Sequence, residues 1–127
     1  MITDWNRDFD RYLDRLENDE SAQGKKVYVR VVAALEFLIG LQAEPVEETP
    51  RMKRVRQSRR YPLWRVAHPY VPGVAVRVIC WFPPEKNEVV VAVLSGDKAS
   101  MGDVFYDSVA SRADLIIDRW IAETEGE

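Results

Sequence analysis

The chain contains 127 residues, of which 46% are hydrophobic and 31% charged, and its formal net charge is −3. This length and apolar content predict one globular domain over residues 1–127. A single cysteine excludes an intramolecular disulfide, and one histidine with one cysteine cannot form the usual zinc site, so we expect neither a metal nor another cofactor. No apolar run is long enough to span a bilayer, so we expect a cytoplasmic protein without a membrane partner.

Two amphipathic helices are predicted near the N-terminus. Thr3 can cap a helix that runs from Asp4 to about Glu17, because its apolar residues recur at helical spacing. These residues are Trp5, Phe9, Tyr12, Leu13 and Leu16. A second helix is predicted from about Lys25 to Leu41, again with one apolar stripe. The two helices would form an α-hairpin whose apolar side covers a sheet.

Short strands and a last helix are predicted after the hairpin. Residues 51–60 form a short strand or extended loop, and residues 61–68 and 74–82 form an antiparallel pair. Residues 89–94 are all apolar, which is typical of a central strand, and a helix follows over about residues 103–122. The order predicts an α+β fold: an N-terminal α-hairpin packed on a small antiparallel sheet, then a C-terminal helix. In this arrangement all helices lie on one face of the sheet.

The positive charge is concentrated in residues 51–82, which we call the basic band. The band contains eight Lys or Arg residues and no Asp or Glu. The segment before it holds 6 basic and 11 acidic residues, and the segment after it holds 4 and 10. Because basic residues alternate with strand-forming ones, we expect a sheet to present them to a polyanion such as nucleic acid. The candidate binding residues at the start of the band are Lys53, Arg54, Arg56, Arg59 and Arg60.

Arg77 lies within an apolar strand, and Arg65 lies within the strand before it. Alternation along the strand places Arg77 on the same face as Trp81. There it either pairs with Glu88 or Asp97, or binds a phosphate through its planar guanidinium. If the strand register brings Arg65 and Arg77 together, two like charges favour an anion between them. Otherwise they are two separate solvated arginines.

Four further residues have side chains suited to chemistry. Cys80 lies in an apolar run and is interpreted as a buried thiol rather than a nucleophile. His68 is the only imidazole and is a possible general acid or base, although a structural or surface role is more usual in a proline-flanked turn. Lys98 and Tyr106 follow the last strand. Tyr106 either stacks on a nucleobase or simply packs.

Taken together, the order and spacing of these segments resemble those of the RelE/ParE superfamily toxins of type II toxin–antitoxin systems. The resemblance extends from the second helix to the last one. The segments that carry it are PRMKRV (50–55), LWRV (63–66), GVAVRVICWF (73–82), VVVAVLSGDK (89–98) and VFYDSV (104–109). This resemblance implies a twisted antiparallel sheet packed on an α-hairpin.

RelE-like and HigB-like members cut messenger RNA in the ribosomal A site, where the substrate's own 2′-hydroxyl attacks the adjacent phosphate. By position, Arg77 resembles the strand arginine that binds and activates the scissile phosphate. Arg65 resembles a basic residue of the preceding strand, and Lys98 the basic residue after the last strand. Tyr106 resembles the tyrosine that stacks on the substrate base. The resemblance implies a metal-independent mRNA endoribonuclease whose partners are the ribosome, mRNA and a cognate antitoxin.

Two alternatives use the same fold. One is a ParE-like inhibitor of DNA gyrase, and the other is a fold relative that only binds a protein partner. The net acidic charge favours these alternatives, as does Ala67, which stands where many members carry a second charged residue. Arg77, Lys98 and Tyr106 together favour the endoribonuclease. Fold alone does not decide among them.

Overall fold

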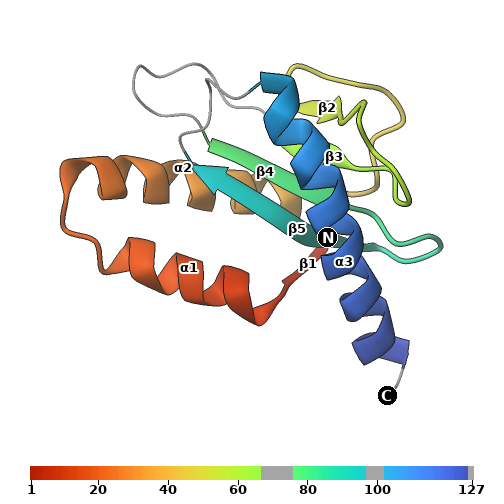
Figure 1. Cartoon of the computed structure of the whole chain (residues 1–127), viewed down its shortest axis with the longest axis horizontal. Helices are drawn as coiled ribbons and strands as arrows, with labels where there is room; N and C mark the ends of the chain where they lie inside the picture. Colours follow the sequence, from red (N-terminus) through yellow and green to blue (C-terminus); the bar gives the residue numbers. More distant parts are fainter. Residues whose placement is uncertain (67–75, 97–101, 126–127) are drawn as a thin grey trace.

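The computed structural model describes residues 1–66, 76–96 and 102–125, with side chains for all of them except residues 76, 92–96 and 102–107. Within these residues the chain forms five strands and three helices (Figure 1). In chain order they are β1 (Ile2–Trp5), α1 (Arg7–Glu17), α2 (Ala22–Ile39), β2 (Met52–Arg54), β3 (Trp64–Val66), β4 (Val76–Trp81), β5 (Glu88–Gly96) and α3 (Gly102–Glu125). The predicted α+β class, N-terminal α-hairpin and C-terminal helix are confirmed.

The sheet has the strand order β1-β5-β4-β3-β2 and is mixed rather than wholly antiparallel. Strands β2 to β5 pair antiparallel, but β1 lies parallel to β5, with Ile2 opposite Glu88 and Trp5 opposite Val91. The antiparallel prediction was wrong on this edge because it assigned part of β1 to a helix. The chain between β1 and β5 contains both N-terminal helices and three strands, so no local sequence pattern signals their pairing.

The first helix begins at Arg7, three residues later than predicted. Asn6, rather than Thr3, is its N-cap, because the Asn6 side chain accepts a hydrogen bond from the backbone N–H of Phe9 at 2.9 Å. The residues before it instead extend beside β5, where backbone groups find ladder partners. The spacing of Trp5 fits the predicted helical stripe as well as the observed strand, which explains the error.

The second helix begins three residues earlier than predicted. Ser21 is its N-cap, and the Ser21 hydroxyl accepts a hydrogen bond from the backbone N–H of Gly24 at 3.0 Å. At its other end, the N-terminal amine of Met1 donates to the carbonyl oxygens of Ile39 (2.7 Å) and Leu41 (3.1 Å). A cation at the carbonyl-rich end of a helix is stabilising. The start of β1 is thereby tied to the end of α2.

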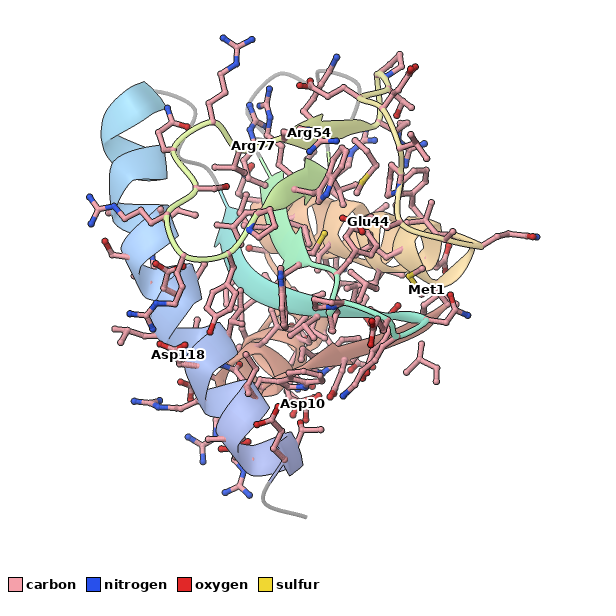
Figure 2. All side chains as sticks on the ribbon, turned by 90° about the vertical axis from the view of Figure 1, so that its right-hand side faces the viewer. Met1, Asp10, Glu44, Arg54, Arg77 and Asp118 are labelled. Carbon is pink, nitrogen blue, oxygen red and sulfur yellow. The ribbon has the colours of Figure 1, made fainter. Side chains whose placement is uncertain are left out.

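The helices cover both faces of the sheet (Figure 1, Figure 2). One core lies between the sheet and the α1–α2 hairpin, and the other lies between the opposite face and α3. Members of the first are Phe9, Val31, Leu38, Trp64, Val78 and Cys80. Members of the second are Val55, Leu63, Ile79, Trp81, Val109 and Ile117. The prediction of helices on one face was wrong, because β4 has buried apolar residues on both faces. Val78 and Cys80 lie on one face, Ile79 and Trp81 lie on the other, and each pair needs its own cover.

The strands that carry the basic band are shorter than predicted. Of residues 51–60 only Met52–Arg54 form a strand, and the predicted pair over 61–68 and 74–82 is described as β3 and β4. Residues 67–75, between those two strands, lie outside the described residues. Strand β5 is longer than predicted and contains a bulge, since Ile79 pairs with Val93 and Cys80 with Val91.

Candidate nucleic-acid interface

Three basic residues of the band lie on one face of the sheet. Lys53 on β2 is opposite Arg65 on β3, and Arg65 is opposite Ile79 on β4. Arg77 precedes Ile79 by two residues, so strand alternation places it on the same face and diagonal to Arg65. Ile79 belongs to the core beneath α3, which makes this the α3 face of the sheet. The strand register therefore brings Arg65 and Arg77 together, which is the arrangement in which two like charges favour an anion between them.

The strand register excludes an ion pair between Arg77 and Glu88. Arg77 is opposite Ser95 on β5, whereas Glu88 lies seven residues earlier on that strand. At about 3.3 Å per residue, the two positions are roughly 23 Å apart along the strand. Asp97, the other acid considered as a partner, lies outside the described residues. The alternative that rests on Glu88 is therefore wrong.

A surface hollow of about 330 Å³ adjoins this face, and we call it the basic hollow. Four basic residues and one acidic residue line it, together with Val55 and Gln57. The basic residues are Lys53, Arg54, Arg56 and Arg65, and the acidic residue is Glu48. A concave surface with an excess of one sign of charge focuses the field and attracts ions of the opposite sign. The basic hollow is therefore suited to an anionic ligand such as a phosphate group.

Arg54 differs from the other predicted binding residues because its guanidinium lies on the α2 side of the sheet. Its central carbon is 4.6 Å from the ring centroid of Trp64, and one of its nitrogens donates to the carbonyl oxygen of Val46 at 3.3 Å. The indole N–H of Trp64 in turn donates to Glu44 at 3.4 Å. These contacts favour a packing role for the Arg54 head group.

Arg60 forms an ion pair with Asp118 on α3, which is 37% exposed, and the hydroxyl of Tyr61 donates to the same carboxylate. The hydrogen bond from Tyr61 is the largest cause that lowers the pKa of Asp118, followed by the hydrogen bond from Arg60. The same carboxylate raises the pKa of Tyr61 and of Arg60. Arg60 does not line the basic hollow, and neither does the exposed Arg59. Their predicted role in binding stays a prediction.

Three predicted site residues cannot be placed by their side chains. His68 and Lys98 lie outside the described residues. Tyr106 lies on α3, but its side chain is not among those described. The roles assigned to these three residues by resemblance therefore stay predictions.

Cys80 has no accessible surface, and burial raises the pKa of its thiol, with a smaller contribution from the charge of Glu44. The interpretation of Cys80 as a core thiol is confirmed. Among the described residues, no group of three or more His, Cys, Asp or Glu side chains could hold a metal ion. No helix in the same part of the chain has the length and apolar content needed to cross a membrane.

Comparisons with known proteins identify no family for this chain. No family model, curated protein or solved structure matches the chain. The residues of the basic band and the strand register that brings them together are therefore the basis for a function.

Sequence reasoning missed the acidic residues of α3 that bind the segment between β2 and β3. Asp114 and Asp118 are one helical turn apart, and both contact Arg60. Their spacing of four residues is a weak signal, because such spacing is common on solvated helix faces. The partners are more than fifty residues apart in the chain, so only the folded structure identifies them.

Proposed function

We propose that the α3 face of the sheet binds the backbone phosphates of RNA, and that the protein is a ribosome-dependent mRNA endoribonuclease toxin of the RelE/HigB type. One observation carries the proposal: the strand register groups Lys53, Arg65 and Arg77 on this face. The basic hollow, which is lined by Lys53 and Arg65 but not by Arg77, supports it, because Glu48 is the one acidic residue among its lining residues.

The grouping of these cations favours a phosphate ligand on physical grounds. Like charges on neighbouring strands repel each other, and an anion between them relieves that repulsion. The guanidinium groups of Arg65 and Arg77 each offer several N–H donors in one plane, which matches two oxygens of a phosphate. Lys53 adds a point charge from the adjacent strand. A phosphodiester backbone supplies such anions in series.

In the proposed reaction the 2′-oxygen of the substrate bonds to the adjacent phosphorus, and the bond from phosphorus to the 5′-oxygen of the next nucleotide breaks. The 2′-hydroxyl gives up its proton, and the departing 5′-oxygen gains one. Negative charge grows on the non-bridging oxygens, where Arg77 and Arg65 stabilise it. Following the resemblance, Lys98 contributes a further cation and Tyr106 stacks on the substrate base. His68 is a candidate for proton transfer.

The proposed toxin requires a partner that silences it. A cognate antitoxin that supplies carboxylates to the basic band would neutralise the surface that binds RNA. The ribosome would present the messenger RNA in an extended, single-stranded form. These partners are inferred from the proposed activity.

Expression in a bacterial host tests the proposal. We expect the wild type to arrest growth, and Arg77→Ala to relieve the arrest because the phosphate loses its main cationic contact. Arg11→Ala is the matched control, because Arg11 is exposed on α1, which packs on the opposite face of the sheet from α3. Circular dichroism of both purified variants shows whether they are folded. Growth arrest that persists in a folded Arg77→Ala variant contradicts the catalytic assignment.

Ribosome profiling after induction identifies the target. The proposed endoribonuclease produces cuts in phase with codons on translated messages. Intact messages with stalled DNA replication would instead identify a gyrase inhibitor and would overturn the endoribonuclease proposal. Normal growth without cleavage would overturn both the endoribonuclease and the gyrase inhibitor, and would favour a protein that only binds a partner.

A further inference from the structure

The segment of residues 55–62, between β2 and β3, has a defined internal structure. The backbone N–H of Val55 donates to the carbonyl of Leu63 at 2.9 Å, which closes the segment at its base. Inside it, the N–H of Ser58 donates to the carbonyl of Val55 at 3.2 Å, and the hydroxyl of Ser58 donates to the same carbonyl at 2.6 Å. That hydroxyl also accepts the N–H of Leu63 at 3.0 Å. We call this segment the β2–β3 loop.

The second half of the β2–β3 loop is fastened to α3. The carboxylate of Asp118 accepts hydrogen bonds from the Arg60 guanidinium and the Tyr61 hydroxyl. The backbone N–H of Arg60 donates to Asp114 one turn earlier on α3, at 3.3 Å. The Tyr61 ring packs against Trp81, with ring centroids 5.1 Å apart. Two polar anchors and one aromatic contact thus hold this half of the loop.

The first half of the same loop contributes Arg56 and Gln57 to the lining of the basic hollow. Its flanking strands contribute Lys53 and Arg65. The loop is short and closed by its own hydrogen bonds, so movement of one half displaces the other. The contacts to α3 hold the half of the loop that follows Ser58, and the hydrogen bonds of Ser58 link that half to the Arg56 side of the hollow.

We propose that Asp118 is a positioning residue for RNA binding: by holding Arg60 and Tyr61, it orders the β2–β3 loop so that the basic hollow is preformed. This inference rests on the proposed binding of RNA phosphates by the hollow. Asp118 itself lies on α3 and is not among the residues that line the hollow. It acts through the loop and not through contact with the ligand.

Charge and positioning make opposite predictions for this residue, which makes the inference testable. Removing a negative charge near a phosphate-binding surface raises affinity if electrostatics alone is at work. The same change would also release the Arg60 guanidinium, adding a cation for the RNA. If Asp118 preforms the hollow, its loss instead weakens binding, because the RNA must then order the loop itself.

The experiment measures the affinity of purified protein for a short fluorescein-labelled oligouridine by anisotropy at fixed salt concentration. The variants are Asp118→Asn and Tyr61→Phe. The second of these removes one anchor without changing the net charge. Glu123→Gln is the matched control, because it makes the same charge change at an exposed position of α3. Arg65→Ala tests the hollow itself. Hydrogen exchange of residues 55–62 in the free protein reports the order of the loop.

We expect Asp118→Asn and Tyr61→Phe to weaken binding by about two- to tenfold, the range for ordering one or two side chains on binding. Exchange in residues 55–62 should rise in both, and Glu123→Gln should bind no more weakly than the wild type. Unchanged or tighter binding by Asp118→Asn, while Arg65→Ala weakens binding, overturns the positioning role alone. No binding by the wild type, or no effect of Arg65→Ala, overturns the proposed RNA-binding function and this inference with it.

Discussion

Asp118 joins α3 to the β2–β3 loop through its ionised carboxylate, which accepts hydrogen bonds from both Tyr61 and Arg60. These contacts hold the pKa of Asp118 below its ordinary value. A carboxyl group whose pKa is lower in the folded than in the unfolded state contributes stability above the unfolded pKa of about 3.9. That contribution is lost as the pH falls through the folded value.

This linkage predicts a specific pH dependence. We expect Asp118→Asn to lose less stability than the wild type as the pH falls from about 5 to about 3, because the variant has no carboxylate to protonate at this position. Thermal unfolding followed by circular dichroism at several pH values measures the difference. Glu123→Gln should follow the wild-type curve. Parallel curves for the wild type and Asp118→Asn would contradict the prediction.

At the scale of the elements, the junction between β1 and α1 shows how one hydrogen bond determines a helix start. Asn6 stands where the strand ends and the helix begins, and its side chain satisfies the N–H of Phe9. The first N–H groups of a helix have no partner within the helix, so such a cap is stabilising. Thr3 has the right side chain for a cap but lies within β1.

The two residues therefore give a direct test of this helix boundary. Asn6→Ala should lower the free energy of unfolding by about 1 kcal/mol, because the N–H of Phe9 loses its acceptor. Thr3→Ala should cost less, since Thr3 caps no helix in the structure. Denaturant unfolding of both variants measures the two values. The reverse ranking would favour the start predicted from the sequence.

At the scale of the whole molecule, the two cores make the sheet a central layer between the α-hairpin and α3. The α3 side also carries Lys53, Arg65 and Arg77, so one helix covers the apolar part of the face that carries the cations. Because α3 covers the apolar residues, the cations lie on the part of the same face next to the helix. The fold thus combines a buried core and a charged surface on one side of one sheet.

The packing of α3 predicts unequal effects of two similar substitutions on that helix. Ile117 is fully buried in the second core, whereas Leu115 is 66% exposed. Ile117→Ala should lower the free energy of unfolding by about 2–5 kcal/mol, because it leaves a cavity. Leu115→Ala should change it by less than about 0.5 kcal/mol. Equal effects in chemical denaturation would show that α3 does not pack on the sheet through this face.

The sequence by itself determined the features that depend on neighbouring residues. Helical spacing identified both N-terminal helices and the C-terminal one, and strand-forming or apolar runs identified β3, β4 and β5. Strand β1 was missed, because part of it was assigned to a helix. The absence of acids from residues 51–82 identified the basic band. Cys80 was recognisable as a core residue because apolar residues flank it on both sides. These properties are periodic or compositional, so a local window of sequence contains them.

Only the tertiary structure decided what depends on residues far apart in the chain. The parallel pairing of β1, the cover of both sheet faces and the contacts of Arg60 with α3 all join distant segments. The common face of Arg65 and Arg77 depends on strand register, and a shift of one residue would have separated them. Local patterns encode which residues can be buried or exposed, but packing decides which of them meet.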